Sequence, residues 1–75
     1  MSEKEKLNLL EETIEADENS LHADMLLSDV EEYDSMAKLA IIVMFEDEFG
    51  KKVTGEMIRG FKTVSDILQV MSKDQ

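Results

Sequence analysis

The stretch from Asp34 to Phe49 reads DSMAKLAIIVMFEDEF, and its apolar residues recur at the spacing of an α-helix. Asp34 or Ser35 can cap the start of this helix by accepting a hydrogen bond from a free backbone N–H. Gly50 follows directly and can end the helix in the left-handed conformation that glycine adopts without strain. The sequence therefore predicts a helix over about residues 35–49.

This predicted helix carries more apolar side chains than one buried face needs. The side chains expected to face a core are Leu39, Ile41, Ile42, Phe45 and Phe49. Those expected at the edge of the core or toward solvent are Met36, Ala40, Val43 and Met44. The surplus indicates either a surface for a partner or, over residues 41–45, a segment that is buried on all sides.

A second predicted helix precedes this one in the chain. Ser2 and Glu5 have the spacing of a capping box, and the apolar residues that follow keep a helical period to about residue 16. Residues 17–34 then form a long connection without a clear period, which is unusual in a small domain unless the segment is packed down or functional. The residues expected to pin this connection to the core are Leu26, Leu27 and Val30.

Two shorter helices are predicted after Gly50. Thr54 can cap a short helix that Gly60 ends, and Thr63 with Asp66 has the spacing of another capping box, at the start of a last helix of about nine residues. Proline is absent and no β-type alternation persists. We therefore predict an all-α, four-helix bundle, with three main helices, one short helix and a long loop between the first two. The expected core is Leu7, Leu10, Ile14, Leu39, Ile42, Phe45, Phe49, Phe61, Val64, Ile67 and Leu68.

Composition narrows the class of partner. The 75 residues hold 18 acidic and 8 basic side chains, for a net charge of −10, and 12 of the acids but only 2 of the bases precede Ser35. Nucleic acids and anionic membranes are bound through positive charge, so neither is an expected partner. No segment approaches the roughly 20 apolar residues of a membrane span, and the first residues do not resemble a secretory signal. We expect a single monomeric domain over residues 1–75, located in the cytoplasm.

The residues give little support to catalysis or to a metal site. Cysteine is absent, and the one histidine, His22, lies in the acidic connection, where it is expected to be an exposed loop residue. The acidic residues do not match a calcium-binding loop, and the methionines are interpreted as core residues or an adaptable contact surface. Neither an enzyme nor a specific metal site is therefore expected.

Ser35 is the residue with the most specific chemical context. It lies where the long connection meets the most apolar helix, and free N–H groups with the helix dipole favour a phosphate at such a position. A serine there could carry a phosphodiester. The commoner role of a serine at this position is to cap the helix, and spacing alone leaves both roles open.

A wider pattern resembles the acyl carrier protein family over nearly the entire chain. The similar residues are Asp34-Ser35-Met36, Leu39, Ile42, Phe45-Glu46, Glu48-Phe49, Val53, Thr63-Val64 and Asp66-Ile67. The resemblance implies that Ser35 receives 4′-phosphopantetheine from coenzyme A and that the thiol of this arm carries an acyl group as a thioester. It also implies a partner-binding face on the predicted helix over residues 35–49, formed by Asp34, Met36, Ala40, Val43, Glu46 and Asp47.

The same resemblance implies a set of partner enzymes. These are a phosphopantetheinyl transferase, an acyl-loading ligase or acyltransferase, and a ketosynthase or another enzyme that consumes the acyl group. Carriers for fatty-acid synthesis are often acidic where this chain has Ala37 and Ala40, which lie beside an unusual Lys38. The common Asp-Leu-Gly before the serine motif is replaced by residues 29–33, which lack the glycine and end in Tyr33, whereas aminoacyl and peptidyl carriers tend to have glycine at the position of Tyr33. These departures favour a dedicated biosynthetic or surface-modification pathway over general fatty-acid synthesis. Two alternatives stay open, namely an aminoacyl or peptidyl carrier of the same fold and an unmodified acidic adaptor.

Overall fold

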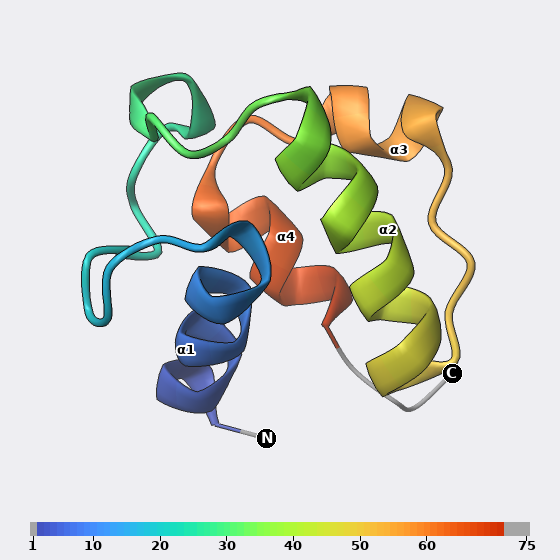
Figure 1. Ribbon diagram of the computed structural model, residues 1–75, viewed down its shortest axis with the longest axis horizontal. Coiled ribbons are helices and arrows are strands. Elements are labelled where there is room, and N and C mark those ends of the chain that lie inside the picture. The colour runs from blue at the N-terminus through green and yellow to red at the C-terminus, as the bar shows by residue number, and fades with distance from the viewer. Residues whose placement is uncertain (1, 72–75) are drawn as a thin grey trace.

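The computed structural model describes residues 2–71 of the chain. Along this part the elements are α1 (Glu3–Ile14), the 3₁₀ turn η1 (Leu27–Asp29), α2 (Ser35–Phe49), α3 (Gly55–Gly60) and α4 (Val64–Val70). The described residues contain four α-helices and no strand, only an isolated antiparallel bridge between Leu26 and Thr63. The predicted all-α bundle, with its short third helix and long first loop, is confirmed (Figure 1).

The helix ends follow the predicted caps. The Ser2 hydroxyl accepts the N–H of Glu5 while the Glu5 carboxylate accepts the N–H of Ser2, and Thr63 and Asp66 form the same reciprocal pair. Gly50 ends α2 with a φ of 63°, in the left-handed region where a glycine is unstrained. Two predicted ends extend too far. The first helix ends at Ile14 rather than residue 16, and α4 has seven residues rather than nine.

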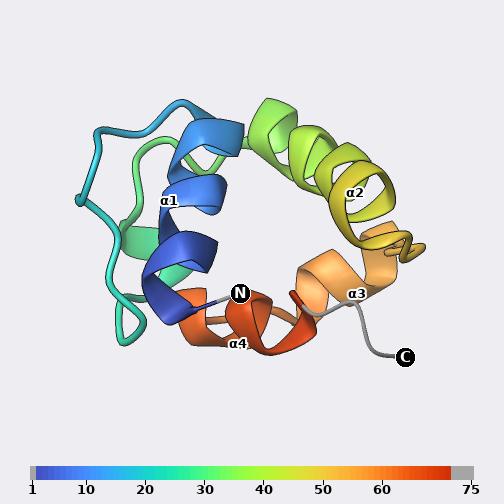
Figure 2. The same ribbon diagram turned by 90° about the horizontal axis from the view of Figure 1, so that it is seen from below.

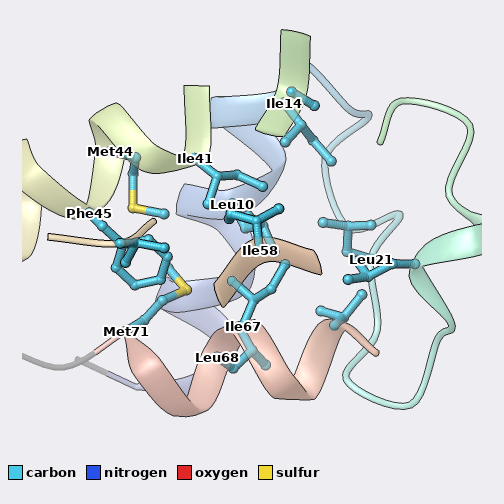
Figure 3. Close-up of a cluster of buried hydrophobic side chains, with 14 of the residues drawn as sticks. Leu10, Ile14, Leu21, Ile41, Met44, Phe45, Ile58, Ile67, Leu68 and Met71 are labelled. Carbon is cyan, nitrogen blue, oxygen red and sulfur yellow. The ribbon is translucent and has the colours of Figure 1, made fainter. Parts of the chain in front are cut away.

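The helices surround one hydrophobic core. α1 packs on α2 and α4, and α3 packs on α2, so that the four helices form a ring seen end-on in Figure 2. Side chains from all four helices and from the loops fill its interior, including Leu10, Ile41, Phe45, Ile58 and Ile67 (Figure 3). The radius of gyration is 11.0 Å, close to the roughly 11 Å expected of a compact chain of this length.

The orientation of α2 differs from the prediction. Leu39 was expected in the core but is 61% exposed, whereas Met44 was expected at the edge or toward solvent and is buried. The buried positions of α2 are Ala37, Ile41, Met44, Phe45 and Phe49. Ile42, like Leu7 and Phe61, packs against the core while staying partly exposed. Because α2 is apolar almost all the way round, its hydrophobic pattern does not fix which side faces inward.

The long connection is held down by backbone pairing as well as by apolar side chains. Leu27 and Val30 are buried as expected, but Leu26 is 49% exposed. Successive residues of an extended segment point to opposite faces. Leu26, at the bridge, therefore points outward, and Leu27 points inward. The Leu27 N–H donates to the Lys62 carbonyl at 2.9 Å, and the Val64 N–H donates to the Met25 carbonyl at 3.0 Å. The connection is therefore fixed to the start of α4.

Candidate functional site

The N-terminus of α2 is capped by Asp34 and not by Ser35. The Asp34 Oδ1 atom accepts the N–H of Ala37 at 2.9 Å, and the Asp34 carbonyl accepts the N–H of Lys38 at 3.0 Å. Ser35 is the first residue of the helix and is exposed to solvent. Capping was the competing interpretation of Ser35, and the structure gives that role to its neighbour.

The N–H groups at this helix end are available to a ligand. Among residues 2–71, no hydrogen bond is recorded for the N–H of Ser35 or of Met36. Such groups carry the positive end of the helix dipole, which stabilises a nearby anion by about 0.3–1 kcal/mol at an exposed site. A phosphate on the Ser35 hydroxyl would lie in this field. The carboxylate of Asp34, the residue before Ser35, opposes this effect, because it repels a phosphate.

The other described serines have different surroundings. The Ser2 hydroxyl caps α1, the Ser20 hydroxyl donates to the Asp17 carbonyl, and the Ser65 hydroxyl accepts from the Gln69 side chain. Ser28 is exposed but lies within η1, away from the start of any α-helix. Ser72 lies outside the described residues. Ser35 is thus the exposed serine, within residues 2–71, that opens a long helix.

The backbone that leads to Ser35 is held by a series of short turns. The Val30 N–H donates to the Leu27 carbonyl at 3.0 Å, and the Tyr33 N–H donates to the Val30 carbonyl at 3.1 Å. Because Leu27 and Val30 are also buried, this segment has few ways to move independently of the core. Ser35 therefore projects from a fixed corner of the molecule, where the connection turns into α2 (Figure 1).

Two open hollows lie beside this corner, and they differ in charge. One, of about 480 Å³, lies between the end of α1 and the start of α2 and is lined by the carboxylate residues Glu15, Glu32 and Asp34 among others. The other, of about 530 Å³, lies between the connection, α2 and the α3–α4 link and is lined by Lys38 and Lys62 with no acidic residue. We call them the acidic hollow and the basic hollow. Residues close to Ser35 in the chain line both hollows, Asp34 and Met36 the acidic one and Tyr33 and Lys38 the basic one.

Tyr33 and Lys38 interact at the edge of the basic hollow. The Lys38 Nζ atom lies 5.5 Å from the centre of the Tyr33 ring, within the range of a cation–π interaction. The Tyr33 hydroxyl is buried without a hydrogen-bond partner among the described residues, and burial raises the pKa of this phenol. The sequence marked Tyr33 and Lys38 only as departures from a family pattern, and no spacing rule would have paired them with Lys62.

The outer face of α2 is more apolar than predicted. Met36 is 74% exposed and Val43 is 55% exposed, both as expected, and Leu39 lies between them on the same side of the helix. Asp34, Glu46 and Asp47 are also exposed, whereas Ala40 is partly buried and lines the acidic hollow. All the predicted partner-face residues except Ala40 are therefore exposed, and Leu39 is exposed beside them.

The histidine and the acidic side chains of residues 2–71 show no grouping typical of a metal site. His22 is exposed, as expected of a loop residue. Within residues 2–71 no three His, Cys, Asp or Glu side chains are grouped as a metal ion would need. In the same residues, each helix is too short or too polar to cross a bilayer.

Comparison with known proteins gives one match. Residues 7–71 match the family model described as phosphopantetheine attachment site, and the match includes α2, α3, α4 and α1 from residue 7 onward. No curated protein and no solved structure matches the chain.

Proposed function

Because the chain belongs to the phosphopantetheine-attachment family, we propose that it is an acyl carrier protein whose arm is attached to Ser35. Domains of this family are non-catalytic carriers that bear a covalent 4′-phosphopantetheine. The thiol of the arm supplies the chemistry, since it holds the cargo as a reactive thioester. The family membership favours a carrier over an unmodified adaptor.

The position of Ser35 is the observation that carries the assignment. Its hydroxyl is exposed, is not used for capping and stands at the start of a helix of 15 residues with free N–H groups beside it. Attachment would join Ser35 Oγ to the phosphorus of the arm, while the bond from that phosphorus to the nucleotide part of coenzyme A breaks and the hydroxyl proton passes to the transferase. The product carries a new negative charge, which the N-terminal end of α2 stabilises.

An acyl cargo is favoured over an aminoacyl or peptidyl one by the residue before Asp34. Carriers of amino acids tend to have glycine there, and this chain has Tyr33, whose ring contacts the Lys38 ammonium.

The alanines of α2 support a dedicated pathway. Ala37 is buried, so an acidic side chain at that position would be forced out of water. An acidic side chain is therefore disfavoured at position 37, where carriers for fatty-acid synthesis often have one.

The exposed part of α2 is the proposed surface for partner enzymes. It combines apolar side chains at Met36, Leu39 and Val43 with carboxylates at Asp34, Glu46 and Asp47, and Ala40 lies at its edge. A net charge of −10 would steer the chain to enzymes with a basic patch and allow fast, reversible contact. The proposed partners are a phosphopantetheinyl transferase, a loading ligase or acyltransferase, and a ketosynthase or another acyl-consuming enzyme.

Intact-mass measurement tests the attachment. The purified chain is incubated with coenzyme A and a phosphopantetheinyl transferase, and we expect one added arm on the parent and none on Ser35→Ala. Ser28→Ala is the matched control, because Ser28 is also exposed but does not open an α-helix, and it should be modified like the parent. Ser35→Ala should unfold within about 0.5 kcal/mol of the parent, since the cap belongs to Asp34.

Two outcomes would contradict the proposal. Labelling of Ser35→Ala would move the attachment to another residue, and an unmodified parent with several transferases would remove the carrier function. The cargo is tested separately, by isolating the chain from its source cells and determining the mass of the group released from the arm. An amino acid in that position would favour the aminoacyl alternative.

A further inference from the structure

The two hollows beside Ser35 offer an attached arm opposite electrostatic surroundings. The acidic hollow presents Glu15, Glu32 and Asp34, whereas the basic hollow presents Lys38 and Lys62 in a chain with a large excess of acids. A group that begins with a phosphodiester is repelled by the first set and attracted by the second. Charge therefore distinguishes two hollows of similar volume.

The location of Lys38 makes it the first cation that such a group would meet. It follows Ser35 by three residues in α2, so the two residues are neighbours on the helix surface. Its side chain is partly buried, and the contact of its ammonium with the Tyr33 ring restricts where that charge can lie. A lysine held in this way binds a phosphate as a point charge at lower entropic cost than a freely moving one.

The rest of the basic hollow matches the remainder of a pantetheine arm. The arm continues from its phosphate into a dimethyl-substituted carbon, a hydroxyl and two amides. The hollow offers apolar surface from Leu27, Val30 and Phe61, and the Ser28 residue adds a hydroxyl. Tyr33 also lines the hollow, and its buried hydroxyl has no hydrogen-bond partner among the described residues.

The chain keeps this hollow in place next to Ser35. The Leu27 N–H to Lys62 carbonyl hydrogen bond joins the connection to the α3–α4 link, and residues of both segments line the hollow. The Asp66 carboxylate accepts the backbone N–H of Lys62 at 2.9 Å, so a negative charge lies close to Lys62. Lys38 is therefore the stronger candidate for the phosphate, and Lys62 for a contact further along the arm.

We propose that the arm on Ser35 rests in the basic hollow, with its phosphate beside Lys38 and its pantoate half against Phe61 and Lys62. This inference rests on the proposed attachment to Ser35. In that state the arm runs away from α1 and along the α3–α4 link. Its first half is then held by the carrier rather than moving freely in solvent, so partner enzymes must draw it out.

Amide chemical shifts of the apo and arm-bearing chain test this resting site. Intact mass first establishes that the arm is attached. We then expect the arm to change the shifts of Ser28, Phe61 and Lys62, and to leave those of Thr13 and Glu15 on the acidic hollow unchanged. Raising the salt concentration should reduce the changes at Phe61 and Lys62, since screening weakens the contact with Lys38.

Substitutions at Lys38 separate a charge contact from a packing effect. Lys38→Met keeps the apolar stem but removes the ammonium, and it should lower the changes at Phe61 and Lys62 by at least half. Lys38→Arg should restore them. Lys52→Met is the matched control, because Lys52 is an exposed lysine outside both hollows, and it should behave like the parent.

The failure of this inference differs from failure of the attachment. If the arm is attached but shifts change only at residues 33–37, or change at Thr13 and Glu15, the resting site is wrong while the carrier function stands. If Lys38→Met has no effect on the changes at Phe61 and Lys62, the charge argument is wrong. If no arm is attached at all, both proposals fail.

Discussion

Glu11 is a carboxylate inside the core, only 2% exposed. Its Oε2 atom accepts the N–H of the buried residue Leu21 at 3.0 Å, so that it joins α1 to the returning connection. Its Oε1 atom is buried and has no partner among the described residues. Helical spacing places Glu11 four residues after Leu7 and three before Ile14, on the apolar side of α1, but it does not reveal that the partner of this carboxylate is the N–H of Leu21.

Substitution of Glu11 should show how much this hydrogen bond contributes. Glu11→Ala leaves the buried Leu21 N–H unpaired, and we expect it to lower the free energy of unfolding by about 1–3 kcal/mol. Glu11→Gln keeps an acceptor without the charge and should stay much closer to the parent. Urea unfolding measures both, with Glu12→Ala as the exposed control. Equal stabilities for Glu11→Ala and Glu12→Ala would show that the bond does not hold the connection.

Asp66 links the stability of the α4 cap to pH. Hydrogen bonds from the Lys62 and Thr63 N–H groups lower the pKa of this carboxyl below its ordinary value. A lowered pKa in the folded state contributes stability above the unfolded pKa, and that contribution disappears as the pH falls through the folded pKa. Asp66→Asn should therefore melt below the parent at pH 7.

The difference in melting temperature should shrink below about pH 4, near the ordinary pKa of an aspartate. Circular dichroism melts of the parent and of Asp66→Asn from pH 7 to pH 2 measure it. A difference that stays constant over this range would show that the charge of Asp66 does not act through the cap.

At the scale of elements, the sequence predicts the N-terminal ends of helices better than their orientation. Ends depend on local chemistry: Ser2, Asp34, Thr54 and Thr63 each accept an N–H within three residues of themselves. Orientation depends on what the helix packs against, and α2 is apolar on too many sides for its pattern to decide. This ambiguity explains why Leu39 was wrongly expected in the core and Met44 at its edge. The backbone pairing of Leu26 with Thr63 joins residues far apart in sequence and had no local signal.

Neighbouring residues of α2 provide a direct test of its orientation. Val43 is more than half exposed and Met44 is buried, although the two are adjacent and similarly apolar. Val43→Glu should unfold within about 0.5 kcal/mol of the parent. Met44→Glu should lose at least the roughly 2–5 kcal/mol that removal of a large core side chain costs, because it also buries a charge. Chemical unfolding gives both values.

The Val43→Glu substitution also tests the partner face. Val43→Glu should slow modification by a phosphopantetheinyl transferase while the fold is intact, since it places a charge in the exposed apolar strip with Met36 and Leu39. Unchanged modification kinetics would remove Val43 from the surface that the transferase reads. A large loss of stability in Val43→Glu would instead place this side chain in the core.

At the scale of the whole molecule, the site divides into a part that the sequence reveals and a part that it does not. The motif from Asp34 to Met36 predicts Ser35 as the attachment residue, because the motif consists of consecutive residues. The basic hollow combines Tyr33 and Lys38 with Phe61 and Lys62, which more than 20 positions separate along the chain. Only the folded chain brings these residues together, so its proposed role could not be inferred from spacing.

Charge distribution is the whole-molecule property with the clearest effect on stability. The net charge is −10, and the excess of acids lies in the segment before Ser35, which contains α1 and the long connection. Repulsion among these carboxylates is spread over many pairs and weakens with screening, for which the Debye length is roughly 10 Å at 0.1 M salt. Folding brings the carboxylates closer together than they are in the unfolded chain, so low salt should destabilise the folded state.

We therefore expect the melting temperature to rise between about 0.01 and 0.2 M NaCl, and divalent cations to raise it at lower concentrations. A gain of about 1 kcal/mol corresponds to roughly 4–8 °C in a domain of this size. The double variant Glu12→Gln, Glu18→Gln removes two exposed carboxylates. It should melt higher than the parent at low salt and respond less to added salt. If the parent's melting temperature is flat over this range, its acids lie too far apart, or are too well solvated, to repel one another measurably.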